Sequence, residues 1–135
     1  MRVVADTNVL FSFFWEDSII RQIIMSSNTE ILSPEFAVDE LKKYSSLIRN
    51  KLKISKKEFI FELGKLKSFV EFFPKNSYLS FMKESEKISP DKDDAEFLAL
   101  CLKMNLPLWS NDKELKKQNK IVVLSTSDII DIYLD

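Results

Sequence analysis

Apolar positions follow two alternating patterns along the chain. Short β-branched or apolar runs predict five strands, at residues 2–5, 30–32, 70–73, 107–109 and 121–124. Apolar residues at helical spacing predict the segments between them as helices, at residues 9–15, 18–25, 34–50, 55–70, 78–88, 90–102, 112–117 and 127–133. Strands that alternate with helices predict an α/β fold, namely a three-layer α/β/α sandwich around a central, mainly parallel, five-stranded sheet. With no repeat or linker in the sequence, we expect one domain over residues 1–135.

Local signals place several of these helices. Ser33 followed by Pro34 predicts a helix start, with Ser33 as the N-cap and Pro34 at the first helical position. Ser55 predicts the next N-cap. Residues 97–102 are apolar on every face and predict a central, covered helix. The aromatic segment 11–15 could form an interface, but we expect it to pack in the core.

The composition excludes several classes of protein. One glycine in 135 residues rules out the glycine-rich loops of dinucleotide-binding and P-loop folds. The absence of histidine rules out imidazole-based catalysis and the usual histidine zinc motifs. A lone cysteine, Cys101, favours a reducing compartment. Asp6 interrupts the N-terminus too early for a signal peptide and no uncharged run could span a bilayer, so we expect a cytoplasmic protein without a membrane segment.

Charge is unevenly distributed although the net charge is only -1. Residues 41–75 carry ten basic and three acidic side chains, whereas the flanking segments are both net acidic. A lysine-rich middle can hold the phosphates of a nucleic acid, or it can be a solvated helix face. The first interpretation leaves the acidic side chains free for a separate task.

Carboxylates follow the predicted strands where ligands bind in open α/β sheets. Asp6 comes directly after the first strand and Asp112 after the fourth, so both lie at the carboxyl edge of a parallel sheet. Asp94 lies near the start of the apolar helix and Glu40 in the helix after the second strand. Carboxylates that converge repel one another unless a cation lies between them, and ligands that are all oxygen favour Mg²⁺ or Mn²⁺. Such ions activate water for attack on phosphorus.

Each acid also has a structural explanation. Asp6 and Asp112 stand where helix N-caps are expected. Asp91 and Asp93 lie in a first turn, where acids complement the helix dipole. Glu40 in a charged helix can simply be solvated.

Taken together, four segments resemble the PIN-domain family over essentially the whole chain. They are Ala5-Asp6-Thr7-Asn8-Val9-Leu10, Val38-Asp39-Glu40-Leu41, residues 91–100 (DKDDAEFLAL) and Leu108-Trp109-Ser110-Asn111-Asp112. The resemblance implies a Mg²⁺- or Mn²⁺-dependent ribonuclease with catalytic, metal-binding acids at Asp6, Glu40, Asp94 and Asp112. It also implies residues that support those acids, namely Thr7, Asn8, Asp91, Asp93, Ser110 and Asn111.

The resemblance also implies partners. Members of the family often act as the toxin of a type II toxin–antitoxin pair, so we expect RNA as substrate, an antitoxin protein and a homodimer. Lysines close to the acids would guide the RNA backbone, namely Lys42, Lys43, Lys113 and Lys116. Two alternatives remain: a catalytically weak PIN-fold module that binds RNA or protein, and a haloacid-dehalogenase-like phosphatase. The phosphatase would need a second aspartate where this chain has Asn8.

Overall fold

Five parallel strands form the centre of the molecule. The computed structural model describes residues 1–134, with side chains through Ile132, and Asp135, the end of the predicted domain, lies outside the described residues. The strands are β1 (Arg2–Ala5), β2 (Glu30–Pro34), β3 (Val70–Phe73), β4 (Leu108–Trp109) and β5 (Val123–Leu124). They pair in the order β3-β2-β1-β4-β5, and every pairing is parallel. The predicted α/β class and five-stranded sheet are confirmed, and the sheet is wholly parallel.

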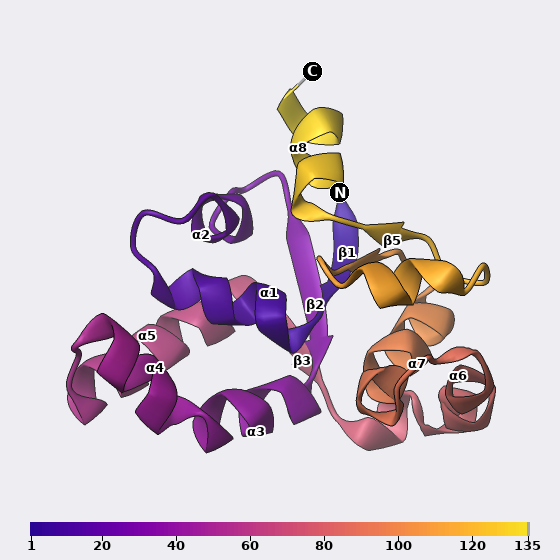
Figure 1. Ribbon diagram of the computed structural model, residues 1–135, viewed down its shortest axis with the longest axis horizontal. Coiled ribbons are helices and arrows are strands. Elements are labelled where there is room, and N and C mark those ends of the chain that lie inside the picture. Colours follow the sequence, from indigo (N-terminus) through magenta and orange to yellow (C-terminus); the bar gives the residue numbers. More distant parts are fainter. Residues whose placement is uncertain (135) are drawn as a thin grey trace.

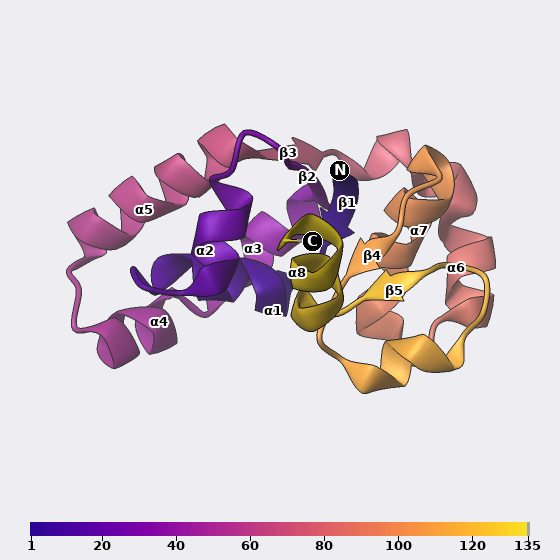
Figure 2. The same ribbon diagram turned by 90° about the horizontal axis from the view of Figure 1, so that it is seen from above.

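Helices cover both faces of this sheet (Figures 1 and 2). The helices are α1 (Thr7–Phe11), α2 (Ile19–Ile24), α3 (Glu35–Lys43), α4 (Ser45–Leu52), α5 (Lys56–Phe69), α6 (Met82–Ile88), α7 (Ala95–Met104) and α8 (Thr126–Leu134). Helices α1 to α5 lie on one side of the sheet, and α6 and α7 lie on the other. The three-layer sandwich predicted from the sequence is therefore present.

The strand order reverses between β1 and β4. From β1 the chain moves outward through β2 to β3, then returns through α6 and α7 to β4 on the other side of β1. In open α/β sheets, ligands bind beside such a reversal, outside the carboxyl ends of the strands. Here Ala5 at the end of β1 pairs with Trp109 at the end of β4. The residues that follow these two strands are therefore neighbours at the expected binding edge.

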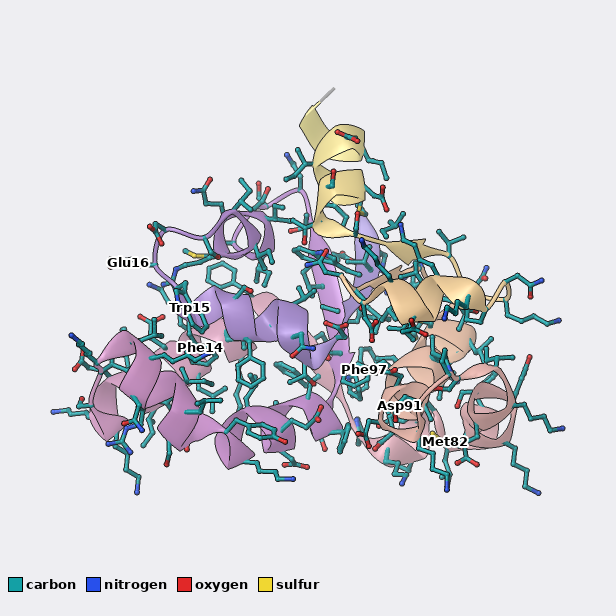
Figure 3. The ribbon with its side chains drawn as sticks, viewed as in Figure 1. Phe14, Trp15, Glu16, Met82, Asp91 and Phe97 are labelled. Atoms are coloured by element: carbon teal, nitrogen blue, oxygen red, sulfur yellow. The ribbon has the colours of Figure 1, made fainter. Side chains whose placement is uncertain are left out.

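The core is continuous and aromatic. In α7 six of the ten residues are buried, which agrees with the prediction of a central helix. The rings of Phe14 and Phe59 stack with centroids 5.1 Å apart. This contact packs the 3₁₀ turn after α1, to which Phe14 belongs, against α5 (Figure 3). Phe13 is fully buried and carries the Arg21 guanidinium over its ring at 4.4 Å. Segment 11–15 thus contributes to the core, as expected.

Two local predictions are wrong. Ser33 is not an N-cap: it belongs to β2, and its buried hydroxyl donates to the Ala5 carbonyl at 2.9 Å, so the cap position falls to Pro34. The helix predicted over residues 34–50 is two helices, because Tyr44 leaves helical geometry at φ -98° and ψ 16° between α3 and α4. The other elements differ from prediction mainly at their ends, which are commonly 3₁₀ turns, as at Ser12–Phe14 and Lys113–Lys117.

Within residues 1–134 none of the helices combines the length and the apolar character needed to cross a bilayer.

Candidate active site

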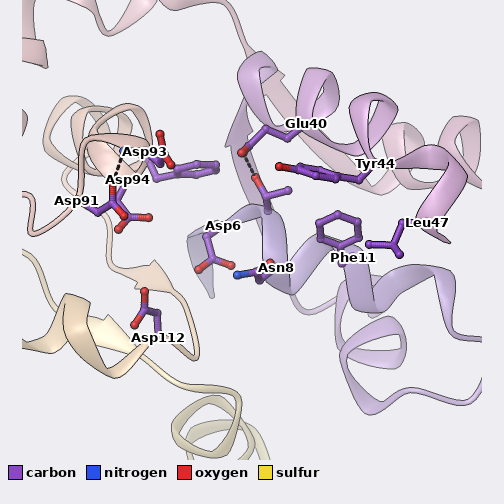
Figure 4. Close-up of a pocket in the computed structure, with 12 residues that line it drawn as sticks. Asp6, Asn8, Phe11, Glu40, Tyr44, Leu47, Asp91, Asp93, Asp94 and Asp112 are labelled. Atoms are coloured by element: carbon purple, nitrogen blue, oxygen red, sulfur yellow. Dashed lines mark hydrogen bonds between the residues drawn. The ribbon is translucent and has the colours of Figure 1, made fainter. Parts of the chain in front are cut away.

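Six carboxylates surround one pocket at the reversal point of the sheet. The pocket has a volume of about 380 Å³, and its acidic residues are Asp6, Glu40, Asp91, Asp93, Asp94 and Asp112. Asp6, Asp94 and Asp112 approach a common space from three sides (Figure 4). The four acids singled out in the sequence therefore meet at one site, although they come from widely separated segments.

Asp6 is the most enclosed of these acids. It follows β1 directly, is 7% exposed, and accepts a hydrogen bond from the Val9 amide at 2.9 Å as the N-cap of α1. Burial raises the pKa of Asp6, and the Asp112 charge adds to this, while hydrogen bonds from Ser110 and Val9 act in the opposite direction. The Asp6 side chain thus caps α1 and lines the pocket at the same time.

Glu40 is held by α1. The Thr7 hydroxyl donates a short hydrogen bond to Glu40 Oε1, which joins α1 to α3 (Figure 4). Burial raises the pKa of Glu40, and the charges of Asp93 and Asp6 raise it further. The Thr7 hydrogen bond lowers that pKa, because it stabilises the charged carboxylate. Glu40 is therefore a positioned side chain rather than a freely solvated one.

Asp94 stands immediately before α7. Burial raises its pKa to about 6, and the charges of Asp91, Asp112, Asp6 and Asp93 contribute in that order. It makes no side-chain cap hydrogen bond to α7. Asp91, in contrast, accepts from the Asp93 amide at 3.0 Å and shapes the turn that leads into this helix. Asp94 thus has a carboxylate that is crowded by negative charge and unused by the helix end.

Asp112 lines the pocket and Ser110 hydrogen-bonds to Asp6, whereas the side chain of Asn111 between them points elsewhere. Asp112 is exposed and caps the Lys113–Lys117 turn by accepting from the Glu114 amide at 3.0 Å. The buried Ser110 accepts from the Asp112 amide at 3.1 Å and also hydrogen-bonds to Asp6, so it connects the two acids. Asn111 turns away from the pocket: its amide donates to Thr126 Oγ1 at 2.9 Å and accepts from the Thr126 amide at 2.7 Å. Asn8 is exposed and lines the pocket.

The four lysines predicted to bind substrate do not line this pocket. Lys42 borders a separate hollow beside β3, together with Glu35, Asp39 and Lys67. Lys43 lies nearer, since its charge lowers the pKa of Glu40. Lys113 is exposed next to Asp112, and Lys116 pairs with Asp128 at 3.1 Å.

The acid set suits a hard divalent cation by its chemistry, because every donor is oxygen and no cysteine or histidine competes. In the part of the chain that the structure describes, however, no three of these groups lie close enough together to hold one ion. The raised pKa values of Asp6, Glu40 and Asp94 express mutual repulsion as well as burial. A cation would relieve this repulsion.

One part of the pocket was not predicted from the sequence. Phe11, Tyr44, Leu47 and Phe97 line it as well as the acids. Glu40, Tyr44 and Leu47 are spaced four and three residues apart, so the continuous helix predicted over residues 34–50 would have placed them on one face. This spacing was the available signal, and it needed Glu40 to be recognised first as facing the pocket.

Comparisons with known proteins agree with this architecture. The structure is similar to the crystal structure of VapBC2 from Rickettsia felis bound to a DNA fragment from its promoter, with a TM-score of 0.67 and 17% sequence identity. The match covers 93% of this chain and 98% of the other, and at this identity it shows a shared fold. None of the curated protein sequences matches the chain. The PIN domain family matches residues 4–129. The chain therefore belongs to the PIN domain family, a family of nucleases.

Proposed function

We propose that this protein is a Mg²⁺- or Mn²⁺-dependent endoribonuclease that hydrolyses RNA phosphodiester bonds. The observation that carries the proposal is the pocket at the β1–β4 reversal, which is lined by Asp6, Glu40, Asp94 and Asp112. PIN domains generally depend on divalent metal ions, which fits a lining rich in carboxylates and free of histidine and cysteine.

The carboxylates of the pocket would have different roles in cleavage. Asp6, Asp94 and Asp112 would hold the cation, and Asp6 provides the rigid point because its burial and its hydrogen bonds from Val9, Asn8 and Ser110 limit its movement. A bound Mg²⁺ or Mn²⁺ supplies an activated water and stabilises the leaving oxygen. Glu40, held by Thr7, would orient the attacking water or help to hold a second cation. Asp91 and Asp93 shape the turn that presents Asp94.

The basic segment 41–75 would hold the RNA backbone outside the acidic pocket. Lys43 is close enough for its charge to lower the pKa of Glu40, and Lys113 and Lys116 follow Asp112 in the sequence. Contacts between lysines and phosphates release counterions, so we expect binding to weaken steeply with salt.

Cleavage of single-stranded and structured RNA with Mg²⁺ or Mn²⁺ tests the proposal. We expect Asp6→Asn and Asp94→Asn to abolish cleavage while the fold is kept, because asparagine also serves as an N-cap at position 6. Asp39→Asn is the matched control, since Asp39 precedes Glu40 but borders the hollow beside β3. Equal cleavage by wild type and all three variants would identify a contaminant and refute the assignment. Calorimetric binding of Mn²⁺ without turnover would instead support a binding module.

We propose an antitoxin-type protein partner and a homodimer. The similarity in fold to a protein that is described as VapBC2 supports the antitoxin-type partner, and the homodimer is an expectation from the family alone. Co-expression with the product of a small neighbouring gene, followed by light scattering of the purified complex, tests both. A monomer that copurifies with no such product and remains active in its presence would contradict the proposal.

A further inference from the structure

The pocket has an apolar half whose exposed side chains serve no purpose in the chemistry above. Tyr44 is 40% exposed and Leu47 is 52% exposed, and both line the pocket with Phe11. Exposure of tyrosine and leucine side chains to water is unfavourable. Exposed apolar groups beside a polar site commonly mark a binding surface.

This apolar half is a direct continuation of the acidic half. Thr7 and Phe11 lie four residues apart on α1, and Glu40 in α3 lies four residues before Tyr44, the C-cap of α3. The Thr7 hydroxyl bonds to Glu40, and the Phe11 ring packs against Tyr44 with centroids 6.1 Å apart. The two helices thus meet through a polar contact and, one turn further, an aromatic contact. Figure 4 shows the Tyr44 hydroxyl directed toward the Glu40 side.

The break between α3 and α4 falls at Tyr44 itself. Its backbone ends one helix and begins the next, while the Tyr44 amide still bonds to the Glu40 carbonyl at 3.0 Å. The Tyr44 side chain therefore lies on the same side of the chain as that of Glu40, and its ring lines the same pocket. The Phe11 ring lies below the Tyr44 ring in the view of Figure 4 and packs against it.

A cation accompanies the ring. Lys43 Nζ lies 5.5 Å from the Tyr44 centroid. At this distance, and on a flexible stem, the ammonium can move aside for a flat ligand and pair with an adjacent phosphate. An exposed aromatic ring with a neighbouring cation is the arrangement by which proteins bind single-stranded nucleic acid, through base stacking and a phosphate contact.

Resting on the proposed nuclease function, we propose that Tyr44, supported by Phe11 and Leu47, stacks an unpaired nucleobase next to the phosphodiester held at the acids. The substrate is therefore single-stranded at that nucleotide, because a paired base has both faces covered within the helix. Tyr44 is a substrate-binding residue, and Lys43 contacts the phosphate beside the stacked base.

Fluorescence of 2-aminopurine tests this directly. A short single-stranded RNA carries the fluorescent base at one position at a time, and Ca²⁺ replaces Mg²⁺ because its looser coordination geometry is poorly suited to positioning the attacking water. Gel analysis checks that the RNA stays intact. We expect quenching at one position with wild type, its loss in Tyr44→Ala, and its retention in Tyr44→Phe, which keeps the ring. The dissociation constant should rise about 5- to 100-fold in Tyr44→Ala.

The control is Phe61→Ala, because Phe61 is 68% exposed and lies on α5 outside the acidic pocket. Phe61→Ala should bind as wild type, and duplex RNA should bind all variants equally. Unchanged quenching in Tyr44→Ala, or an equal loss in Phe61→Ala, overturns the proposal. Binding of a protein partner that depends on Tyr44, with RNA binding unaffected, overturns it as well.

The assay separates this inference from the nuclease assignment. Stacking that depends on Tyr44 without any cleavage in Mg²⁺ or Mn²⁺ refutes the nuclease and leaves the base site standing. Cleavage with the same KM in wild type and Tyr44→Ala refutes the base site and leaves the nuclease standing. When both hold, Tyr44→Ala raises KM far more than it lowers kcat.

Discussion

Replacement of Asp94 by asparagine should stabilise the metal-free protein, although it should abolish cleavage. Burial and four neighbouring aspartates raise the pKa of Asp94 to about 6, from an ordinary value of 3.8. The folded state therefore disfavours the charged carboxylate. Because the folded-state pKa is raised, the penalty is absent below about pH 4, grows between about pH 4 and 6, and is complete above that range.

The magnitude follows from this shift. For a fully buried group, a pKa of about 6 instead of 3.8 corresponds to about 3 kcal/mol. Asp94 is partly exposed, and solvent screening leaves about 1 kcal/mol. The substitution of Asp94 by asparagine removes no cap hydrogen bond, because the Asp94 side chain makes none to α7. For 135 residues, 1 kcal/mol raises Tm by about 3–4 °C.

Thermal unfolding in EDTA from pH 4 to pH 8 measures this. The Tm difference between Asp94→Asn and wild type should be near zero at pH 4 and reach its full value above pH 6. Asp17→Asn is the control, since Asp17 is exposed in a loop outside the pocket. Excess Mn²⁺ should raise the Tm of wild type more than that of Asp94→Asn, because the ion compensates the same charges. A difference that is constant with pH, or equally large in Asp17→Asn, would refute the assignment of crowded charge to Asp94.

Three further changes have defined outcomes. Gly64→Ala should raise the free energy of unfolding by about 1 kcal/mol in urea denaturation, because Gly64 lies inside α5 and an added Cβ meets nothing within 4 Å; a loss of stability would contradict the open space. Lys53→Gly should stabilise by about 1 kcal/mol in the same assay, because Lys53 ends α4 at φ 55°, where side chains are strained; no gain would show that the cap is unstrained. Thr7→Val should raise the pKa of Glu40 by removing its hydrogen bond, so the pH profile of cleavage should shift to higher pH; an unchanged profile would separate Glu40 from the titrating step.

The sequence was informative where chemistry follows strand ends. Asp6 and Asp112 could be located because buried β-branched runs identify strands, and parallel strands bring their carboxyl ends together. Asp94 could be located because the apolar segment after it is too uniform to be a surface helix. The fold class thus depends on patterns that are local and strong, whereas the choice of the four acids, Glu40 above all, depended on the resemblance to the PIN-domain family.

What was missed depends on tertiary contacts. Nothing local marks Tyr44 as a helix break, since the residues on both sides favour a helix and only the packing of α3 and α4 on different neighbours separates them. Ser33 has the composition of an N-cap, but the neighbouring β1 carbonyl binds its hydroxyl instead. Asn111 lies within the motif Leu108-Trp109-Ser110-Asn111-Asp112, yet its side chain forms hydrogen bonds with Thr126 and points away from the acids. In each case a partner distant in sequence decides the outcome.

The position of β4 between β1 and β5 has a consequence for synthesis on the ribosome. Strand β1 is made first, but one side of it stays unpaired until residues 108–109 emerge, because β4 is the neighbour that covers it. Asp6 and Asp112 therefore come together only after the residues up to Asp112 have left the ribosome. A growing chain can pair β1, β2 and β3 before β4 is made, but it lacks Asp112 from the acid set until then. The acid set is therefore completed only after the three strands that precede β4 have been made.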